Sequence, residues 1–380
     1  MKYHFDSRTK SFVVFSIFVL SFCISCSSND SSAPEVKLIQ KEQEFLSSLI
    51  SVQNDMNSVW KGFECFNEFP IFILTEENNG IFINPPTSEI ANSEQITSSL
   101  LGGPNLYRNE DILESTKDYL ADSPIFWGYL EYPDHTIFVY HLSEIADNFY
   151  NNYKNRNGYF HVAIFFHELF HAFQLLKNNN QFLGDFGQQD FLGYPLTSES
   201  LPLLLLLFDT MIDAYHQSAG DQKKQFLSYY VAIQSELEKI DTSANSLIRT
   251  HGFYLEKLEG TARYVEVFGT LNSIDNNTIE DPTHGFNDFA NSITSSLEVR
   301  QVYARRIFYH TGAGAVYLLK ELGLSNVEDL MLIPENTPYD VAANFLNLTS
   351  EESNDLLEEV KARYNWEDLL ERSQFLLGLQ

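Results

Sequence analysis

An apolar segment near the middle of the chain carries three ionisable side chains that a folded protein would bury. The segment GYFHVAIFFHELFHAFQLLK, from Gly158 to Lys177, is apolar over most of its length, yet its centre holds His167, Glu168 and His171. An unpartnered polar or charged group in an apolar interior is costly, so buried charges are normally paired or bind metal ions. The chain must therefore fold in a way that gives these three side chains a partner.

The spacing of the two histidines suits a single metal ion. On a helix, His167 and His171 are about 40° apart around the axis and one turn apart along it. HELFH is thus an HExxH motif, in which neutral imidazoles bind Zn²⁺ and the glutamate, here Glu168, acts as general base toward a water molecule. The alternative is a pair of core histidines bonded to backbone carbonyl groups. We favour zinc because the surrounding helix is apolar all round, as expected of a helix at the floor of a cleft.

A catalytic zinc site needs a third protein ligand, which leaves one position for water. The acidic candidates that follow the motif are Asp185, Asp190, Glu199, Glu256, Glu259 and Glu266. We favour Glu259, because the segment LEGTARYVE around it predicts a helix. Gly260, the next residue, would permit a close approach to the histidine helix.

Two segments together resemble a known group of enzymes. HELFHAFQ followed at long range by LEGTARYVE is similar to the gluzincin group of zinc metallopeptidases, which are related in plan to thermolysin. Many bacterial members pair HExxH with an EGxAxYxE segment, matched here by Glu259, Gly260, Ala262, Tyr264 and Glu266. The resemblance spans roughly Tyr159 to Leu322. It implies a zincin-like fold, with Glu259 of a second helix completing a zinc site.

The chain also departs from the thermolysin pattern in two places. The interval between His171 and Glu259 is much longer than in thermolysin-like enzymes, and an inserted helical pair, Leu201 to Ile240, would explain it. Arg263 stands where that pattern has a carboxylate, one turn after the glutamate ligand. Orienting a zinc-bound histidine would then fall to Glu266 or to another residue.

A later segment, FYHTGAGAVY, offers two further candidates. Gluzincins commonly place a tyrosine or histidine near the start of such a helix, where it donates a hydrogen bond to the oxyanion of the tetrahedral intermediate. The resemblance thus implies this catalytic role for Tyr309 or His310. The alternative is a core tyrosine beside a surface histidine.

The N-terminus has the pattern of an export signal. Lys2, Arg8 and Lys10 precede the apolar run SFVVFSIFVLSFCIS, after which the sequence turns polar in CSSNDSSAPE. CISC resembles a bacterial lipobox, with Cys26 as the lipidated residue. The alternative is an ordinary signal peptide cleaved nearby. We therefore expect a signal peptide over residues 1–25, a polar tether over 26–35, and a protein anchored by lipid to a bacterial membrane, at the outer membrane or cell surface.

The rest of the chain predicts an α+β fold with two lobes. Residues 36–180 contain a helix, two hairpins that would form a small mixed sheet, and the HExxH helix. Residues 181–380 are largely helical and contain the helix of the third ligand. A strand from the second hairpin, TIFVYHL, would lie along the cleft and pair with an extended peptide.

Composition narrows the class of partner. The chain has 380 residues, is 44% hydrophobic and carries a formal net charge of −28, which disfavours nucleic acid because phosphates repel such a surface. We expect a zinc metallopeptidase that acts on peptides or proteins and touches the membrane only through its lipid. The alternatives are a hydrolase of another substrate and a zinc-binding surface lipoprotein without peptidase activity. A binding lipoprotein with an accidental HExxH would hold no stoichiometric metal.

Overall fold

The computed structural model describes residues 37–64, 66, 69–76, 78–97, 104–121, 127–142, 159–177, 188–271 and 293–379. These residues belong to one compact unit, Val36–Gln380. The predicted signal peptide, the tether and Cys26 lie outside them, and the lobe boundary near residue 180 stays a prediction. Within the described ranges, no helix combines the length and apolar character needed to cross a membrane.

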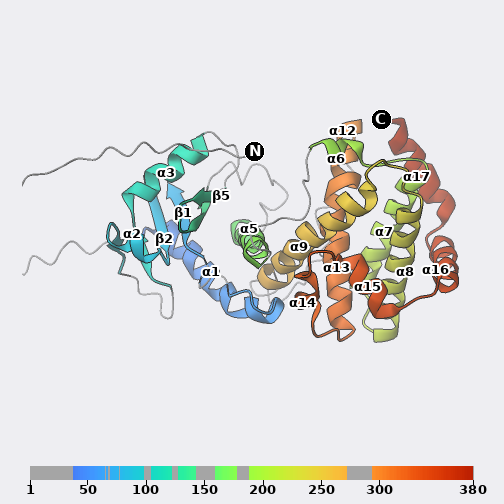
Figure 1. The fold of residues 1–380 in the computed structure, drawn as a ribbon, viewed down its shortest axis with the longest axis horizontal. Helices are drawn as coiled ribbons and strands as arrows, with labels where there is room; N and C mark the ends of the chain where they lie inside the picture. Colours follow the sequence, from blue (N-terminus) through green and yellow to red (C-terminus); the bar gives the residue numbers. More distant parts are fainter. Residues whose placement is uncertain are drawn as a thin grey trace, which may run out of the picture. The chain divides into compact units, whose positions relative to one another are not determined.

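The strands form one mixed sheet, and all of them precede the HExxH helix (Figure 1). They are β1 Ile71–Glu76, β2 Asn79–Ile83, β3 Glu94–Gln95, β4 Leu106–Arg108, β5 Trp127–Glu131 and β6 Thr136–His141. The order is β3-β4-β2-β1-β6-β5, in which β1 and β6 are parallel and the other pairs antiparallel. Both predicted hairpins are present, as β1–β2 and β5–β6, and the α+β class is confirmed.

The position of β6 overturns one expectation. β6 pairs with β1 on one side and with β5 on the other, so the segment TIFVYHL has no free edge for a peptide. Among the described strands, β5 is instead the edge strand at this side of the sheet.

Alternating side chains give the sheet two buried faces. One face packs against α3 (Glu110–Ala121) in a cluster that contains Phe72, Leu74, Phe82, Ile112, Leu113, Ile137 and Val139. The other face joins the main core with α1 (Gln40–Val59) and α5 (Tyr159–Lys177), and contributes Ile71, Ile73, Ile81, Phe138 and Tyr140. α5 is the HExxH helix, so the sheet covers one side of it.

The remaining helices follow in chain order, after a short α2 (Thr87–Ile90) between strands. They are α6 Gln188–Gly193, α7 Ser200–Tyr215, α8 Gly220–Lys239, η3 Ile248–Phe253, η4 Glu256–Gly260, α9 Thr261–Val265, η5 Glu266–Leu271, α12 Ser296–Gln301, η6 Val302–Arg306, α13 Ile307–Glu321, α14 Val327–Met331, α15 Pro338–Leu346, α16 Ser350–Arg363 and α17 Trp366–Gly378. α7, α8 and α13 pack against one another (Figure 1). The inserted pair expected over Leu201 to Ile240 corresponds to α7 and α8.

The helix of the third-ligand candidate has unusual geometry. From η3 to η5 it is helical almost without interruption but contains three π-helical segments. Such segments are rare in proteins overall, and those that occur often lie at functional sites. Gly260 on this helix faces α13, since a Cβ atom there would lie 2.6 Å from the Cα of Gly312. The expectation that Gly260 approaches the HExxH helix is therefore wrong. The close approach is to α13.

Candidate metal centre

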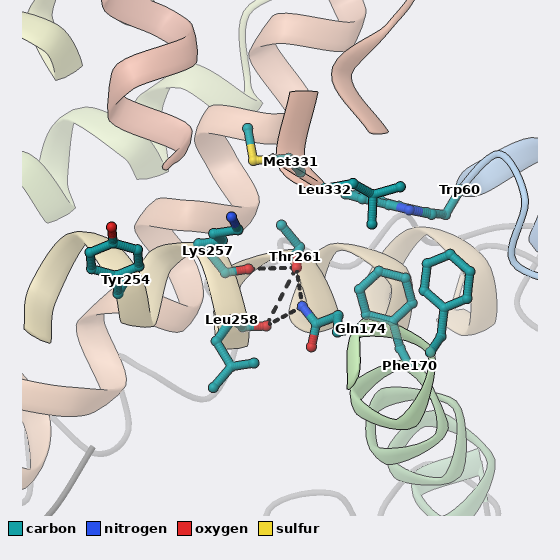
Figure 2. A pocket seen from close by; sticks show the side chains of 10 residues that line it. Trp60, Phe170, Gln174, Tyr254, Lys257, Leu258, Thr261, Met331 and Leu332 are labelled. Atoms are coloured by element: carbon teal, nitrogen blue, oxygen red, sulfur yellow. Dashed lines mark hydrogen bonds between the residues drawn. The ribbon is translucent and has the colours of Figure 1, made fainter. Parts of the chain in front are cut away.

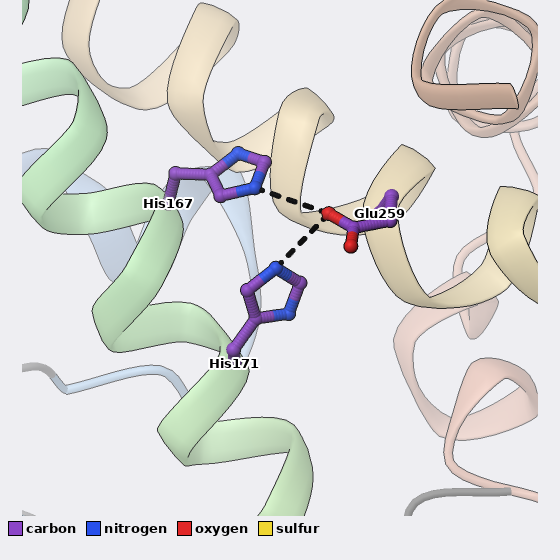
Figure 3. A group of neighbouring side chains, drawn as sticks. All are labelled: His167, His171 and Glu259. Carbon is purple, nitrogen blue, oxygen red and sulfur yellow. Dashed lines mark hydrogen bonds and ion pairs between the residues drawn. The ribbon is translucent and has the colours of Figure 1, made fainter. Parts of the chain in front are cut away.

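His167, His171 and Glu259 point toward one another from two helices (Figure 3). The two histidines are buried on α5, one turn apart, with ring centroids 4.9 Å apart. Oε2 of Glu259, from η4, lies 3.4 Å from Nε2 of His167 and 3.2 Å from Nε2 of His171. In the described part of the chain, no other group of three His, Cys, Asp or Glu side chains brings its ligand atoms this close.

These separations fit the edges of a metal polyhedron. Ligand atoms about 2.0–2.2 Å from a tetrahedral zinc are about 3.3–3.6 Å from one another. A charge-assisted hydrogen bond between an imidazolium and a carboxylate is shorter, about 2.7–2.9 Å. Two imidazoles and one carboxylate are also a donor set that zinc accepts in catalytic sites. The three residues therefore fit a zinc ion.

The outer nitrogen of each imidazole has its own acceptor. Nδ1 of His167 donates to Oε2 of Glu266 at 2.9 Å, and Nδ1 of His171 donates to Oε1 of Gln174 at 2.7 Å. This bonding assigns the proton of each neutral ring to Nδ1 and leaves the Nε2 lone pair directed at Glu259. Glu266 in turn is ion-paired with Arg263, the residue that departs from the thermolysin pattern.

Gln174 was not expected from the sequence, although it lies three residues after His171 on the same helix face. Its amide nitrogen donates to the carbonyl of Leu258 at 2.9 Å and to Oγ1 of Thr261 at 2.7 Å, which fixes its oxygen toward His171. Figure 2 shows this amide at the side of a cavity of about 30 Å³. Such a volume holds a water molecule or two. The cavity is therefore too small to be a substrate site.

The motif glutamate keeps one oxygen available. Oε2 of Glu168 is shielded from solvent and has no hydrogen-bond partner among the residues that the structure describes. Burial raises the pKa of Glu168 to about 7, although His167 and His171 act in the opposite direction. A carboxylate with a free oxygen and a pKa near neutrality can accept a proton and return it.

The charges of the candidate metal ligands influence one another. Burial alone would lower the pKa of His167, but the Glu259 and Glu266 carboxylates outweigh it and raise this pKa to about 10. Burial opposes ionisation of Glu259 as well, yet His171 and His167 hold its pKa well below the usual range. In the absence of an ion, a proton therefore sits between the histidines and Glu259. A metal ion bound at this point has to displace it.

The two candidates on α13 have different surroundings. The ring of Tyr309 stacks on that of His167 with centroids 6.1 Å apart, and, after burial, the charge of Glu259 contributes to raising the pKa of its hydroxyl. His310 is buried beside Phe208 of α7, with ring centroids 6.4 Å apart, and its charge acts on Glu266. The structure thus brings Tyr309 to the candidate metal ligands. His310 does not reach them, but it is buried and is therefore not a surface residue.

The other acidic candidates do not join the cluster. Glu256 is buried, but its carboxylate accepts hydrogen bonds from Tyr230, Gln234 and Thr311. Glu199 is exposed and Asp190 lies on α6. Asp185 lies outside the described residues.

The site as a whole offers three converging donors, a glutamate with a free oxygen and a tyrosine hydroxyl. Together they can hold a divalent ion, move one proton and donate one hydrogen bond to a reacting group. Comparisons of this chain with protein-family models, with curated proteins and with solved structures found no match.

Proposed function

We propose that this chain is a zinc-dependent hydrolase with a zincin-like fold, and in particular a metallopeptidase that cleaves peptide bonds by hydrolysis. The observation that carries the proposal is the pair of distances from Oε2 of Glu259 to the two histidine Nε2 atoms, 3.4 and 3.2 Å. They are close to the ligand separations of tetrahedral zinc, and both imidazoles direct Nε2 at that point, where zinc would displace the proton that the ion-free site holds. Its ligands would be His167, His171 and Glu259.

A zinc ion held there would act as a Lewis acid toward the attacking water and the substrate carbonyl group. Glu168 accepts the proton of the water through its free oxygen and later delivers it to the leaving nitrogen. Tyr309 donates a hydrogen bond to the oxygen of the tetrahedral intermediate. Burial and the charge of Glu259 raise the pKa of Tyr309 well above its usual range, so this hydroxyl stays protonated as a donor.

Hydrogen bonds to the Nδ1 atoms fix the orientation of both histidine rings. Glu266 holds Nδ1 of His167 and is itself held by Arg263, while Gln174 holds Nδ1 of His171. In this chain Glu266 therefore takes the role that a carboxylate at position 263 would have in the thermolysin pattern. His310 acts through Glu266 in this proposal and has no direct catalytic part.

Two other functions share the same residues. A hydrolase of a non-peptide substrate would use Glu168 in the same way. A surface lipoprotein that only binds zinc would have no use for a shielded glutamate oxygen without a partner. That oxygen favours a hydrolase over simple metal binding.

The variant Glu168→Gln tests the catalytic proposal. Glu168 is not a ligand, so we expect the variant to keep one zinc per chain while turnover of a cleaved peptide falls by a factor of roughly 10² to 10⁴. Metal content is measured by mass spectrometry, and cleavage with a quenched-fluorescence peptide library, before and after chelation and with zinc restored. Purified wild-type protein without stoichiometric metal, or a variant with near wild-type turnover, would contradict the proposal. Metal without cleavage of any peptide would favour the alternatives.

A further inference from the structure

A second buried glutamate lies on the same short helix as the candidate ligand Glu259. Glu256 of η4 is 0% exposed. Its Oε2 atom accepts a hydrogen bond from the Tyr230 hydroxyl at 2.5 Å, and its Oε1 atom accepts one from Nε2 of Gln234 at 2.8 Å and another from the Thr311 hydroxyl. Tyr230 and Gln234 belong to α8 and Thr311 to α13. One carboxylate therefore joins η4 to two other helices.

The backbones of η4 and α13 touch beside this carboxylate. A Cβ atom on Gly312, the residue after Thr311, would lie 2.8 Å from the Cα atom of Glu256. Tyr309, the candidate hydrogen-bond donor of the metal centre, lies two residues before Thr311. The Glu256 carboxylate thus fastens η4 to the stretch of α13 that carries Tyr309.

Glu256 and Glu259 point in different directions, although only three residues separate them. In an α-helix, side chains three residues apart are about 60° apart around the axis. A π-helical turn contains more residues, so the third residue falls further short of a complete turn. Glu259 meets His167 and His171 of α5, whereas Glu256 meets α8 and α13. The rotation of η4 about its own axis therefore sets where both carboxylates point.

A buried carboxylate is an expensive way to join helices. Removing a charge from water is unfavourable even when hydrogen bonds compensate for it, and apolar side chains of similar volume often stabilise a core equally well. An apolar contact tolerates small rotations of a helix, whereas hydrogen bonds weaken steeply when their angles change. The use of Glu256 at this crossing favours a role in fixing geometry over a role in stability alone.

We propose that Glu256 is a positioning residue of the metal centre. Its hydrogen bonds to α8 and α13 fix the rotation of η4 that directs the Glu259 carboxylate at His167 and His171. Glu256 acts through Glu259 and contacts neither the metal ion nor the substrate. The inference rests on the zinc site of the proposed function, but it concerns the geometry of the ligands. Metal binding tests it without any substrate.

Two substitutions of Glu256 separate its hydrogen bonds from its bulk. Glu256→Leu removes all three bonds, whereas in Glu256→Gln the amide oxygen can accept from Gln234 and Thr311 and the NH2 group can donate to the Tyr230 hydroxyl oxygen. We expect the zinc dissociation constant to rise by roughly 10- to 100-fold in Glu256→Leu and to stay within about threefold of wild type in Glu256→Gln. The visible absorption of Co²⁺-loaded protein, which reports coordination geometry, should change in Glu256→Leu.

Two neighbouring tyrosines of α8 give a milder test with its own control. Tyr230→Phe removes one hydrogen bond to Glu256, whereas Tyr229→Phe removes a bond of 2.7 Å to Glu359 of α16, away from η4. Both can lower the unfolding midpoint. Only Tyr230→Phe should weaken zinc binding by the folded protein, by roughly three- to tenfold, and alter the Co²⁺ spectrum.

Zinc affinity is measured by chelator competition well below the unfolding midpoint of each variant, so that only folded proteins are compared. The inference is overturned if folded Glu256→Leu or Tyr230→Phe binds zinc like wild type, if Glu256→Gln loses as much affinity as Glu256→Leu, or if Tyr229→Phe loses as much as Tyr230→Phe. If Glu256→Leu does not fold, the tyrosine pair decides. Wild-type protein that binds no zinc would overturn the proposed function and this inference together, whereas zinc binding without peptide cleavage would count against the proposed function alone.

Discussion

Glu256 and Glu259 show how strongly the surroundings decide the role of a residue. They lie three residues apart on η4, and both are acidic candidates for a zinc ligand. Glu259 faces two imidazoles, which lower its pKa, whereas Glu256 is enclosed by hydroxyl and amide groups, and burial raises its pKa to about 7. The first is therefore an anion ready to bind a cation. The second is close to the balance between carboxylate and carboxylic acid at neutral pH.

This difference gives a paired test of the third ligand. Glu259→Ala leaves two imidazoles to hold zinc, so we expect metal affinity and activity to fall together while the apo protein stays folded. Glu256→Gln is the control and should retain zinc, because an amide of the same shape can accept from Gln234 through its oxygen while its NH2 group donates to the Tyr230 hydroxyl oxygen. Both are measured by competition with a chromophoric chelator and by circular dichroism. Equal zinc affinity in wild type and Glu259→Ala would exclude Glu259 as a ligand.

The coupling between His167 and its carboxylate neighbours predicts how zinc binding depends on pH. In the ion-free protein the pKa of His167 is raised to about 10, so at pH 7 the site holds a proton that zinc has to displace. Affinity should therefore rise with pH between 6 and 8, by up to about tenfold per pH unit for each proton released. Calorimetry in buffers of different ionisation enthalpy measures that proton directly. Zinc binding without proton release would contradict this account of the ion-free site.

At the scale of elements, short sequence patterns predicted the helices and strands whose formation depends mainly on neighbouring residues. The HExxH spacing identified α5, and strand-forming residues around turn sequences identified both hairpins. Residues 353–372 are divided between α16 and α17, because Asn365 between the two helices adopts a left-handed conformation with φ of 51°. The spacing of His167 and His171, with the resemblance around Glu259, located the donors. Gln174 was missed because its role depends on contacts across elements.

The packing of η4 on α13 predicts a stability effect. A Cβ atom on Gly260 would lie 2.6 Å from the Cα of Gly312, a backbone atom that cannot move aside without separating the helices. We expect Gly260→Ala to destabilise the protein by about 1–3 kcal/mol, as overpacking does, despite the better helix propensity of alanine. Gly220→Ala, where a Cβ atom meets nothing within 4 Å, should be neutral or slightly stabilising. Urea unfolding of both variants and of the wild-type protein measures these effects. A Gly260→Ala midpoint equal to that of wild type would contradict the close approach of the two helices.

At the scale of the whole molecule, α5 is held from two directions. It contacts β6 on the sheet side and α9 and η5 on the helical side. The donors come together across a long stretch of sequence, since Glu259 follows His167 by 92 residues and Glu266 follows it by 99. Such a site forms only when the sheet part and the helical part fold together. This explains why the candidate ligands could be predicted from the sequence but their geometry could not.

The attachment of this unit to a membrane is the last expectation, and it depends on one atom near the N-terminus. If the sulfur of Cys26 carries the lipid, Cys26→Ser cannot be acylated, so the protein should lose fatty-acid label and leave the membrane fraction. Cys23→Ser is the matched control, because it lies three residues earlier in the same apolar run and should still be labelled. Growth with an alkynyl fatty acid, followed by alkaline washing of membranes, measures both effects. Undiminished labelling of Cys26→Ser would rule out Cys26 as the lipidation site, and loss of label in Cys23→Ser alone would move the site to Cys23.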